Sequence, residues 1–147
     1  MLDAETLRLR IEALLEYLVR VDRFKEIGRD RFVNDADTHH LAERYLQLAT
    51  EAALDIAHHI IADRNYTPPS SYREAFAILN KHGVMPSALT TRLQAWAGYR
   101  DLLVHGYLDI DHGIAWDAIQ NDLEDLCAWA ATAAALLTEP ASAQRSR

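Results

Sequence analysis

Apolar residues recur every three or four positions along most of this chain, which is the spacing of amphipathic α-helices. The first repeat is carried by six residues: Leu7, Ile11, Leu14, Leu15, Leu18 and Val21. It predicts a helix over roughly residues 3 to 27, which Gly28 can end. No stretch alternates apolar and polar residues for long enough to predict a β-sheet.

A second repeat begins after Thr38, the expected cap, and continues to about Asp63. Its apolar residues cover most of the helix circumference, which is typical of a central helix. A run of helix breakers follows over residues 65–70. Ser71 and Glu74 then form a capping box for a short third helix that ends at Gly83.

Two further helices complete the pattern. Pro86 opens the fourth, over about residues 87 to 105, and the fifth starts near Ile114 and ends before Pro140. The predicted fold class is therefore all-α, an up-and-down bundle of about five helices. We expect residues 1–139 to form a single domain and residues 140–147 to form a flexible tail.

Composition agrees with one compact core, because half of the 147 residues are apolar. The single cysteine, Cys127, excludes an internal disulfide and indicates a reducing cytoplasm; its apolar surroundings predict a buried structural thiol. The chain has neither a signal-peptide pattern nor an apolar run of about 18 residues. We therefore expect a soluble, cytoplasmic protein without a membrane partner.

The candidate chemistry lies where the fourth helix ends, in the pattern R-x4-H-x-Y formed by Arg100, His105 and Tyr107. Arginine offers a permanent, fork-shaped charge for phosphoryl oxygens, and histidine can move protons near neutral pH. Gly106 favours a helix end, so His105 would lie in the last turn, where the negative end of the helix dipole favours its protonated form. An arginine and a histidine at this spacing are also common on solvated helix surfaces, so the pattern needs context.

Other polar residues leave alternatives open. The adjacent pairs His39-His40 and His58-His59 lack the i,i+4 spacing of helical zinc ligands, so no metal site is expected. His58 or His59 either packs at the core edge or turns its ring towards the motif from the second helix. The three tryptophans are expected in the core or in a subunit interface: Trp96, Trp116 and Trp129.

The charge pattern argues against indiscriminate nucleic-acid binding, because the net charge is −7, with 22 acidic and 15 basic residues. Basic residues cluster at the end of the first helix: Arg20, Arg23, Lys25, Arg29 and Arg31. This cluster is either an RNA contact or a solvated helix end. Arg44 is a further candidate for RNA contact or for support of the motif, unless it is ion-paired with Glu43 or Asp101.

Several blocks of this sequence, in the same order, resemble the HepT-type toxins of the HEPN superfamily. They are AERYLQLATEAALDIAHHIIA at 42–62, SYREAFAILNKHGVMPSAL at 71–89, RDLLVHGYLDID at 100–111 and AWDAIQNDLEDL at 115–126. The resemblance covers most of the chain. HepT sequences often carry asparagine after the motif arginine, where this chain has Asp101, which is expected to orient Arg100 or His105.

The resemblance implies a HEPN ribonuclease toxin in a type VII-like HEPN/MNT toxin–antitoxin system. In RNA the 2′-hydroxyl can attack its own phosphodiester, so cleavage needs proton transfer and a cation but no metal ion. His105 would be the general acid or base and Arg100 would stabilise the phosphorane. Because one motif holds one imidazole, HEPN proteins commonly form dimers in which two motifs share a cleft, and we expect a homodimer here.

The resemblance also implies how the toxin is controlled. A cognate MntA-type minimal nucleotidyltransferase antitoxin would transfer AMP from ATP to Tyr107, with no other cofactor, and toxin and antitoxin could form a hetero-oligomer. The added phosphate and nucleoside would occupy the place of RNA beside Arg100 and His105. The alternative is a non-catalytic helical adaptor module that binds a nucleotide or RNA through the same residues.

Overall fold

The computed structural model describes residues 3–105 and 110–138. These residues form α-helices joined by short connections and contain no strand, so the predicted all-α class is confirmed. In chain order the helices are α1 (Ala4–Asp22), the 3₁₀ turn η1 (Arg23–Glu26), α2 (Arg29–Asn34), α3 (Ala36–Asp63), α4 (Tyr72–Lys81), α5 (Ser87–His105), α6 (His112–Asn121) and α7 (Leu123–Leu136). The predicted tail over 140–147 lies outside the described residues.

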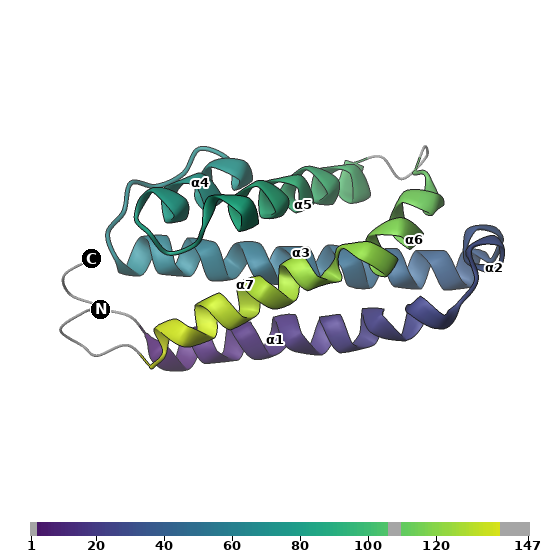
Figure 1. The fold of residues 1–147 in the computed structure, drawn as a ribbon, viewed down its shortest axis with the longest axis horizontal. Helices are drawn as coiled ribbons and strands as arrows, with labels where there is room; N and C mark the ends of the chain where they lie inside the picture. Colours follow the sequence, from purple (N-terminus) through teal and green to yellow (C-terminus); the bar gives the residue numbers. More distant parts are fainter. Residues whose placement is uncertain (1–2, 106–109, 139–147) are drawn as a thin grey trace.

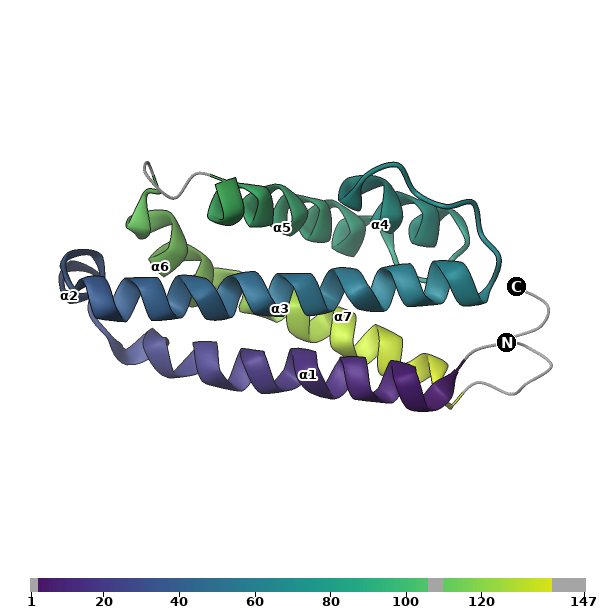
Figure 2. The ribbon, with the colours of Figure 1, turned by 180° about the vertical axis from the view of Figure 1, so that it is seen from behind.

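The long helices α1 and α3 lie side by side and run in opposite directions (Figure 1). Seen from behind, α7 crosses this pair obliquely on the side opposite the viewer (Figure 2). Helices α4 and α5 form a second layer against α3, on the side away from α1. The predicted second helix is α3, and it has the predicted central position because it contacts each of the other α-helices.

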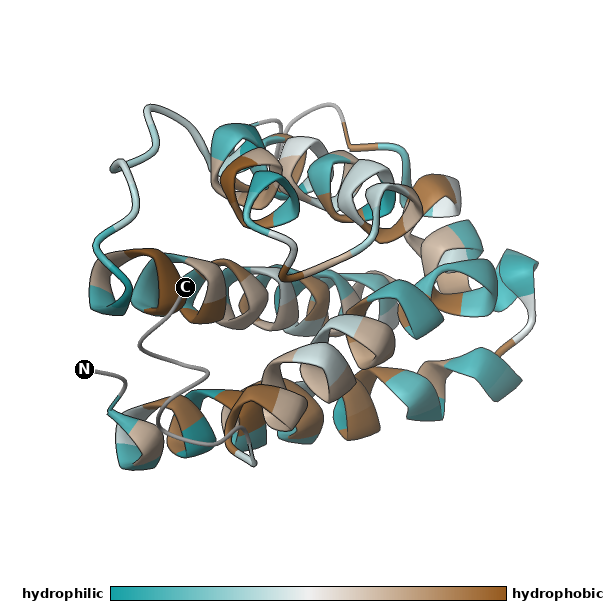
Figure 3. Cartoon of the chain, turned by 60° about the vertical axis from the view of Figure 1, so that its left-hand side comes forward, coloured by the Kyte–Doolittle hydropathy of each residue, from teal (hydrophilic) through white to brown (hydrophobic). Residues whose placement is uncertain are grey.

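Five of the six residues of the first predicted apolar repeat are buried, and the sixth, Leu15, is exposed. Apolar and polar stretches alternate around each helix in Figure 3, and the buried side chains of α1 include Leu7, Leu14 and Val21. Trp129 is fully buried, and its indole N–H donates to the carbonyl of Ala53 at 3.0 Å. Such burial of apolar area is the main source of stability in a bundle of this kind.

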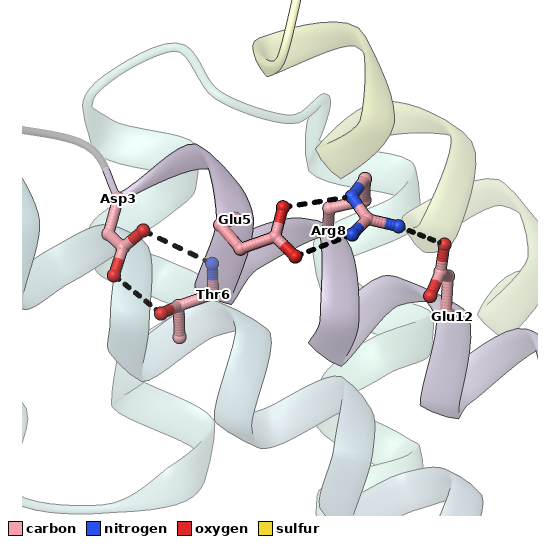
Figure 4. Close-up of polar contacts among 5 residues, drawn as sticks. All are labelled: Asp3, Glu5, Thr6, Arg8 and Glu12. Carbon is pink, nitrogen blue, oxygen red and sulfur yellow. Dashed lines mark hydrogen bonds and ion pairs between the residues drawn. The ribbon is translucent and has the colours of Figure 1, made fainter.

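Local capping explains where the first helix begins. The Asp3 carboxylate accepts a hydrogen bond from the backbone N–H of Thr6 at 3.2 Å and one from the Thr6 hydroxyl (Figure 4). One turn later, Arg8 bridges Glu5 and Glu12 on the exposed face of α1. The start predicted near residue 3 is thus correct, because an N-cap carboxylate satisfies an otherwise unpaired helix N–H.

The capping box predicted for the third helix is also present in part. The Ser71 hydroxyl accepts from the backbone N–H of Glu74 at 3.1 Å, while the Glu74 carboxylate accepts from Ser70 instead of returning to Ser71. Gly83 has a φ of 78°, the left-handed conformation that commonly follows a helix end. This α4 geometry fixes Tyr72 as the first residue of the helix.

Three predicted boundaries were wrong. The first helix ends at Asp22 and continues as the 3₁₀ turn, and α2 was not predicted. The cap of α3 is Asp35 rather than Thr38, whose hydroxyl donates to the Asp35 carboxylate at 2.6 Å. The predicted last helix is divided at Asp122, because Asn121 and Asp122 have low helix propensity and the chain turns there to send α7 across α1.

Cys127 is exposed on α7, so the prediction of a buried thiol was wrong. Its neighbours Leu126 and Trp129 take the inward positions of this helix.

Within the described ranges, no helix combines the length and apolar character needed to cross a bilayer.

Candidate active site

Arg100 lies on α5 and is held by carboxylates from two directions. Its Nε and Nη2 atoms donate to Glu51 Oε1 on α3, at 3.3 and 3.0 Å. Its Nη1 atom donates to Asp101 Oδ1 at 3.4 Å. The Glu51 contact clamps one edge of the guanidinium, whereas the long Asp101 contact holds the other edge weakly.

The electrostatic surroundings keep Arg100 charged. Partial burial lowers its pKa, but the hydrogen bond to Glu51 and the contacts with Tyr72 and Asp101 outweigh burial, and the pKa rises from its ordinary value. The side chain is 18% exposed, while that of Asp101 is 58% exposed. Arg100 is therefore a fixed cation whose weakly held edge faces a solvated carboxylate.

A cavity of about 520 Å³ lies in front of Arg100, between α3, α4 and α5. It is lined by His58, Pro69, Ser70, Ser71, Tyr72, Arg100, Asp101 and His105. The structure thus brings together three of the residues singled out in the sequence: Arg100, Asp101 and His105. Tyr107 lies outside the described residues.

The opposite wall of this cavity carries residues to which the sequence gave little or no role. The guanidinium carbon of Arg100 lies 5.1 Å from the centre of the Tyr72 ring. The His58 ring lies against the same tyrosine, 5.8 Å between centroids and 24° from parallel. His58 thus lines the same cavity as Arg100 and His105, which favours the alternative in which its ring faces the motif. Glu51 and Tyr72 could not be assigned, because their approach to Arg100 depends on how α3 and α4 pack against α5.

The basic candidates near the first helix lie elsewhere. Arg20 and Arg23 line a separate, shallow cavity with Glu16 and Val19. Arg20 is paired with Glu16 at 3.0 Å and lies over the Tyr45 ring. Lys25 is paired with Asp22 at 3.3 Å. These residues do not join the Arg100 cavity, and RNA contact by them stays a prediction.

Arg44 lies between the two regions. It lines a small cavity of about 150 Å³ with His40, Glu43, Gln47, Leu103 and Ile110. Within the parts of the chain that the structure describes, no ion pair joins Arg44 to Glu43 or Asp101, in contrast to the alternative considered from the sequence. Gln47 connects this cavity to the motif. Its side-chain amide donates a hydrogen bond at 3.2 Å to Glu51, the carboxylate that also holds Arg100.

A histidine cluster lies beside this small cavity. His112 Nδ1, on α6, is 2.6 Å from the buried Glu43 carboxylate, and the His39 ring stacks on His112 at 3.5 Å. His40 Nδ1 approaches the other Glu43 oxygen at 3.6 Å. Over residues 3–105 and 110–138, no group of three histidine, cysteine or acidic side chains is placed to hold a metal ion.

Comparison with known proteins places this geometry in a family. The family model described as "Ribonuclease HepT-like" matches residues 14–132. A tRNA nuclease HepT from Aphanizomenon flos-aquae is 32% identical over 115 residues, covering 78% of each chain. An mRNA nuclease HepT from Shewanella oneidensis is 32% identical over 80 residues, covering 54% of this chain and 60% of that one.

A solved structure shares the fold. It is the tri-AMPylated Shewanella oneidensis HEPN toxin in complex with its MNT antitoxin, with a TM-score of 0.81 at 24% identity over 92% of this chain and 99% of that chain. At this identity the likeness concerns the fold alone. Because the family model spans most of the chain and includes the whole Arg100 motif, this chain belongs to the HepT-like ribonuclease family of HEPN proteins.

Proposed function

We propose that this protein is the toxin of a type VII-like HEPN/MNT toxin–antitoxin system and cleaves RNA without a metal ion. The observation that carries the proposal is the cavity in which Arg100, Asp101 and His105 meet, in a chain of the HepT-like family. The relatives are named as nucleases of tRNA and of mRNA, which supports RNA as the substrate class.

The chemistry follows from the groups present. The 2′-oxygen attacks the adjacent phosphorus as a base removes its proton, and the bond to the 5′-oxygen breaks as that oxygen receives a proton. His105, exposed at the end of α5, is the group that exchanges one of these protons. Arg100 stabilises the extra negative charge on the pentacoordinate phosphorus. No redox step or external cofactor is needed for this balance.

Asp101 and Glu51 have different parts in this proposal. Glu51 holds the Nε edge of Arg100 through two hydrogen bonds, so it fixes the direction of the guanidinium. Asp101 holds Nη1 at 3.4 Å and is solvated, so a phosphate oxygen can take its place. Asp101 is thus an orienting group that yields to the substrate.

Assembly and control complete the proposal. A homodimer would supply a second motif, and hence a second imidazole, to each cleft. A cognate MntA-type nucleotidyltransferase would attach ATP-derived AMP to Tyr107, two positions beyond the end of α5. The solved relative named as AMPylated and bound to an MNT antitoxin supports this mode of control.

One experiment separates this function from a non-catalytic adaptor. Purified protein is incubated with end-labelled total RNA in the presence of EDTA. We expect discrete cleavage products whose amount grows with time. A mobility shift with intact RNA would support the adaptor alternative, and cleavage that requires added Mg²⁺ would contradict the metal-independent mechanism.

A further inference from the structure

The cavity in front of Arg100 is larger than the proposed cleavage step uses. Arg100, Asp101 and His105 supply the charge and the proton transfer, and they occupy the α5 wall. The remaining wall is formed by His58 on α3 and by Ser70, Ser71 and Tyr72 at the start of α4. This second wall has no part in the chemistry above, although it borders the same space.

The aromatic rings of this wall, those of His58 and Tyr72, stack on each other. Tyr72 is half-buried and packs against the core, and the Arg100 guanidinium lies over its ring at 5.1 Å. His58 stacks on Tyr72 at 24° from parallel and is itself exposed to the cavity. In the described portion of the chain, no hydrogen bond or ion pair occupies the ring nitrogens of His58. The exposed ring of His58, with Tyr72 behind it, is thus the aromatic surface that the cavity offers beside the Arg100 cation.

A surface of this kind suits an unpaired nucleobase. Bases of single-stranded RNA are free to stack on histidine and tyrosine rings, whereas bases in a duplex are already stacked. With a phosphate of the strand bound by Arg100, the base of an adjoining nucleotide can reach the second wall, because Arg100 and His58 line one cavity.

The neighbouring hydroxyls bear on base selectivity. The Ser71 hydroxyl accepts from the Glu74 N–H, and the Ser70 hydroxyl donates to the Glu74 carboxylate. Each hydroxyl uses one of its functions in these contacts, which leaves Ser71 its O–H as a donor and Ser70 its oxygen as an acceptor. The stacking contact itself tolerates every base, because each has a π-face.

We propose that His58 and Tyr72 form a stacking platform for one nucleobase of single-stranded RNA, beside the phosphate held by Arg100. The platform selects unpaired over paired RNA, and its stacking contact accepts any base. The proposal rests on the ribonuclease function proposed above. It makes His58 a binding residue and not a proton-transfer group.

The test measures binding and cleavage separately. Binding is measured by fluorescence anisotropy with a 2′-O-methyl oligonucleotide, which lacks the attacking hydroxyl and cannot be cleaved. The variants are His58→Ala, which removes the ring, and His58→Phe, which keeps an aromatic face without ring nitrogens. The matched control is His82→Ala, because His82 also stacks on a tyrosine, Tyr66 at 3.6 Å, but lies outside the cavity.

We expect His58→Ala to weaken binding of the single strand about tenfold, in the range found when a base-stacking ring is removed, and to raise KM similarly with kcat little changed. His58→Phe and His82→Ala should bind within about twofold of the original protein, as expected when the stacking contact is kept. The effect of His58→Ala should vanish with a duplex of the same sequence. Circular dichroism shows whether each variant is folded.

Three outcomes would overturn the proposal. These are unchanged binding by His58→Ala, a loss of binding by His58→Phe equal to that of His58→Ala, and the loss of one limb of the pH–rate profile in His58→Phe, which would assign proton transfer to His58. If the original protein binds the oligonucleotide through His58 but never cleaves RNA, the proposed ribonuclease function fails while the platform stands.

Discussion

Arg100 meets its substrate already surrounded by negative charge. Two carboxylates, Glu51 and Asp101, contact one guanidinium, so these three side chains together carry one excess negative charge. RNA must therefore displace or outweigh a carboxylate to reach the cation. Asp101 and a phosphate group of the RNA therefore compete for the Nη1 edge of Arg100.

Substituting the two carboxylates separately tests this competition. Asp101→Asn removes the competing charge, and we expect KM for a short RNA to fall about two- to fivefold, as for an exposed pair of up to about 1 kcal/mol. Glu51→Gln loosens the clamp on Arg100, and kcat should fall about tenfold or more because the guanidinium is misplaced. Steady-state kinetics measure both. A rise in KM for Asp101→Asn would mean that the carboxylate assists binding.

Tyr99 gives a prediction about alkaline pH. Burial, followed by the charges of Glu43 and Asp111, raises the pKa of its phenol above the ordinary value. Its hydroxyl has no hydrogen-bond partner among the described residues. Above about pH 10 the unfolded phenol ionises while the folded one stays protonated, so stability falls as pH rises.

The variant Tyr99→Phe should remove this alkaline loss. Near pH 7 it should be neutral or stabilising by up to about 1 kcal/mol, because an unpaired buried hydroxyl is removed. Urea unfolding at pH 7 and at pH 10.5 measures the difference. Equal alkaline destabilisation of the original protein and of Tyr99→Phe would show that other groups cause it.

At the scale of helices, α3 and α6 are joined by a buried carboxylate and an imidazole. Glu43 is 5% exposed and its partner His112 is the first residue of α6. His112→Ala would remove the hydrogen-bond partner of the buried carboxylate and leave it only the longer contact with His40 at 3.6 Å, which should cost about 1–3 kcal/mol of unfolding free energy. The double variant with Glu43→Gln should be less destabilised than the sum of the single variants, as urea titration can measure. Additive effects would argue against a direct pair.

The helices differ in how well the sequence predicts them. The start of α4 is predictable because its cap, Ser71, and its end, Gly83, are local signals. The six residues of α2 are too few for a repeat, and its one buried residue, Phe32, gives no period. The break at Asp122 depends on the direction that α7 takes across α1, which no local pattern contains.

The residues of the candidate site also differ in how well the sequence predicts them. Arg100 and His105 lie in one contiguous stretch, so the motif itself indicates them. Glu51 lies 49 positions from Arg100, and its contact depends on the register between α3 and α5. Tyr72 and His58 reach the cavity for the same tertiary reason. Sequence therefore predicts the reacting groups, while packing supplies the residues that hold and surround them.

Across the whole molecule, α1, α3 and α7 form the scaffold, and the α4–α5 layer carries the cavity on the side away from α1 (Figure 1). Arg100, Asp101 and His105 line this cavity at the end of α5. One chain supplies a single motif histidine, His105, to its cavity. We therefore expect two subunits to share a cleft, so that the cleft contains two such histidines.

Mixing inactive subunits tests the shared cleft. His105→Ala alone should lose about 10²–10⁴-fold in cleavage rate, and Arg100→Ala about 10²–10³-fold, with helicity preserved because the side chains line a cavity. When both inactive proteins are mixed, a mixed cleft combines one intact Arg100 with one intact His105. If function is shared, activity should rise above that of either inactive protein, but stay below that of the original protein because one imidazole is missing. Sedimentation should give about twice the 16.6 kDa chain mass. No recovery on mixing, despite exchange of subunits, would confine each site to one chain.

Control of the toxin belongs to the same scale, because it requires a second protein. Each AMP on Tyr107 would bring about one negative charge and a bulky nucleoside to the motif, where Arg100 can bind the phosphate in place of RNA. We expect co-expression with a cognate MntA-type nucleotidyltransferase to yield inactive protein whose intact mass has increased by whole AMP units. Tyr107→Phe should keep the original mass and remain toxic. Neutralised protein of unchanged mass, or a Tyr107→Phe variant that is neutralised without forming a tight complex, would show that inhibition does not act through the tyrosine.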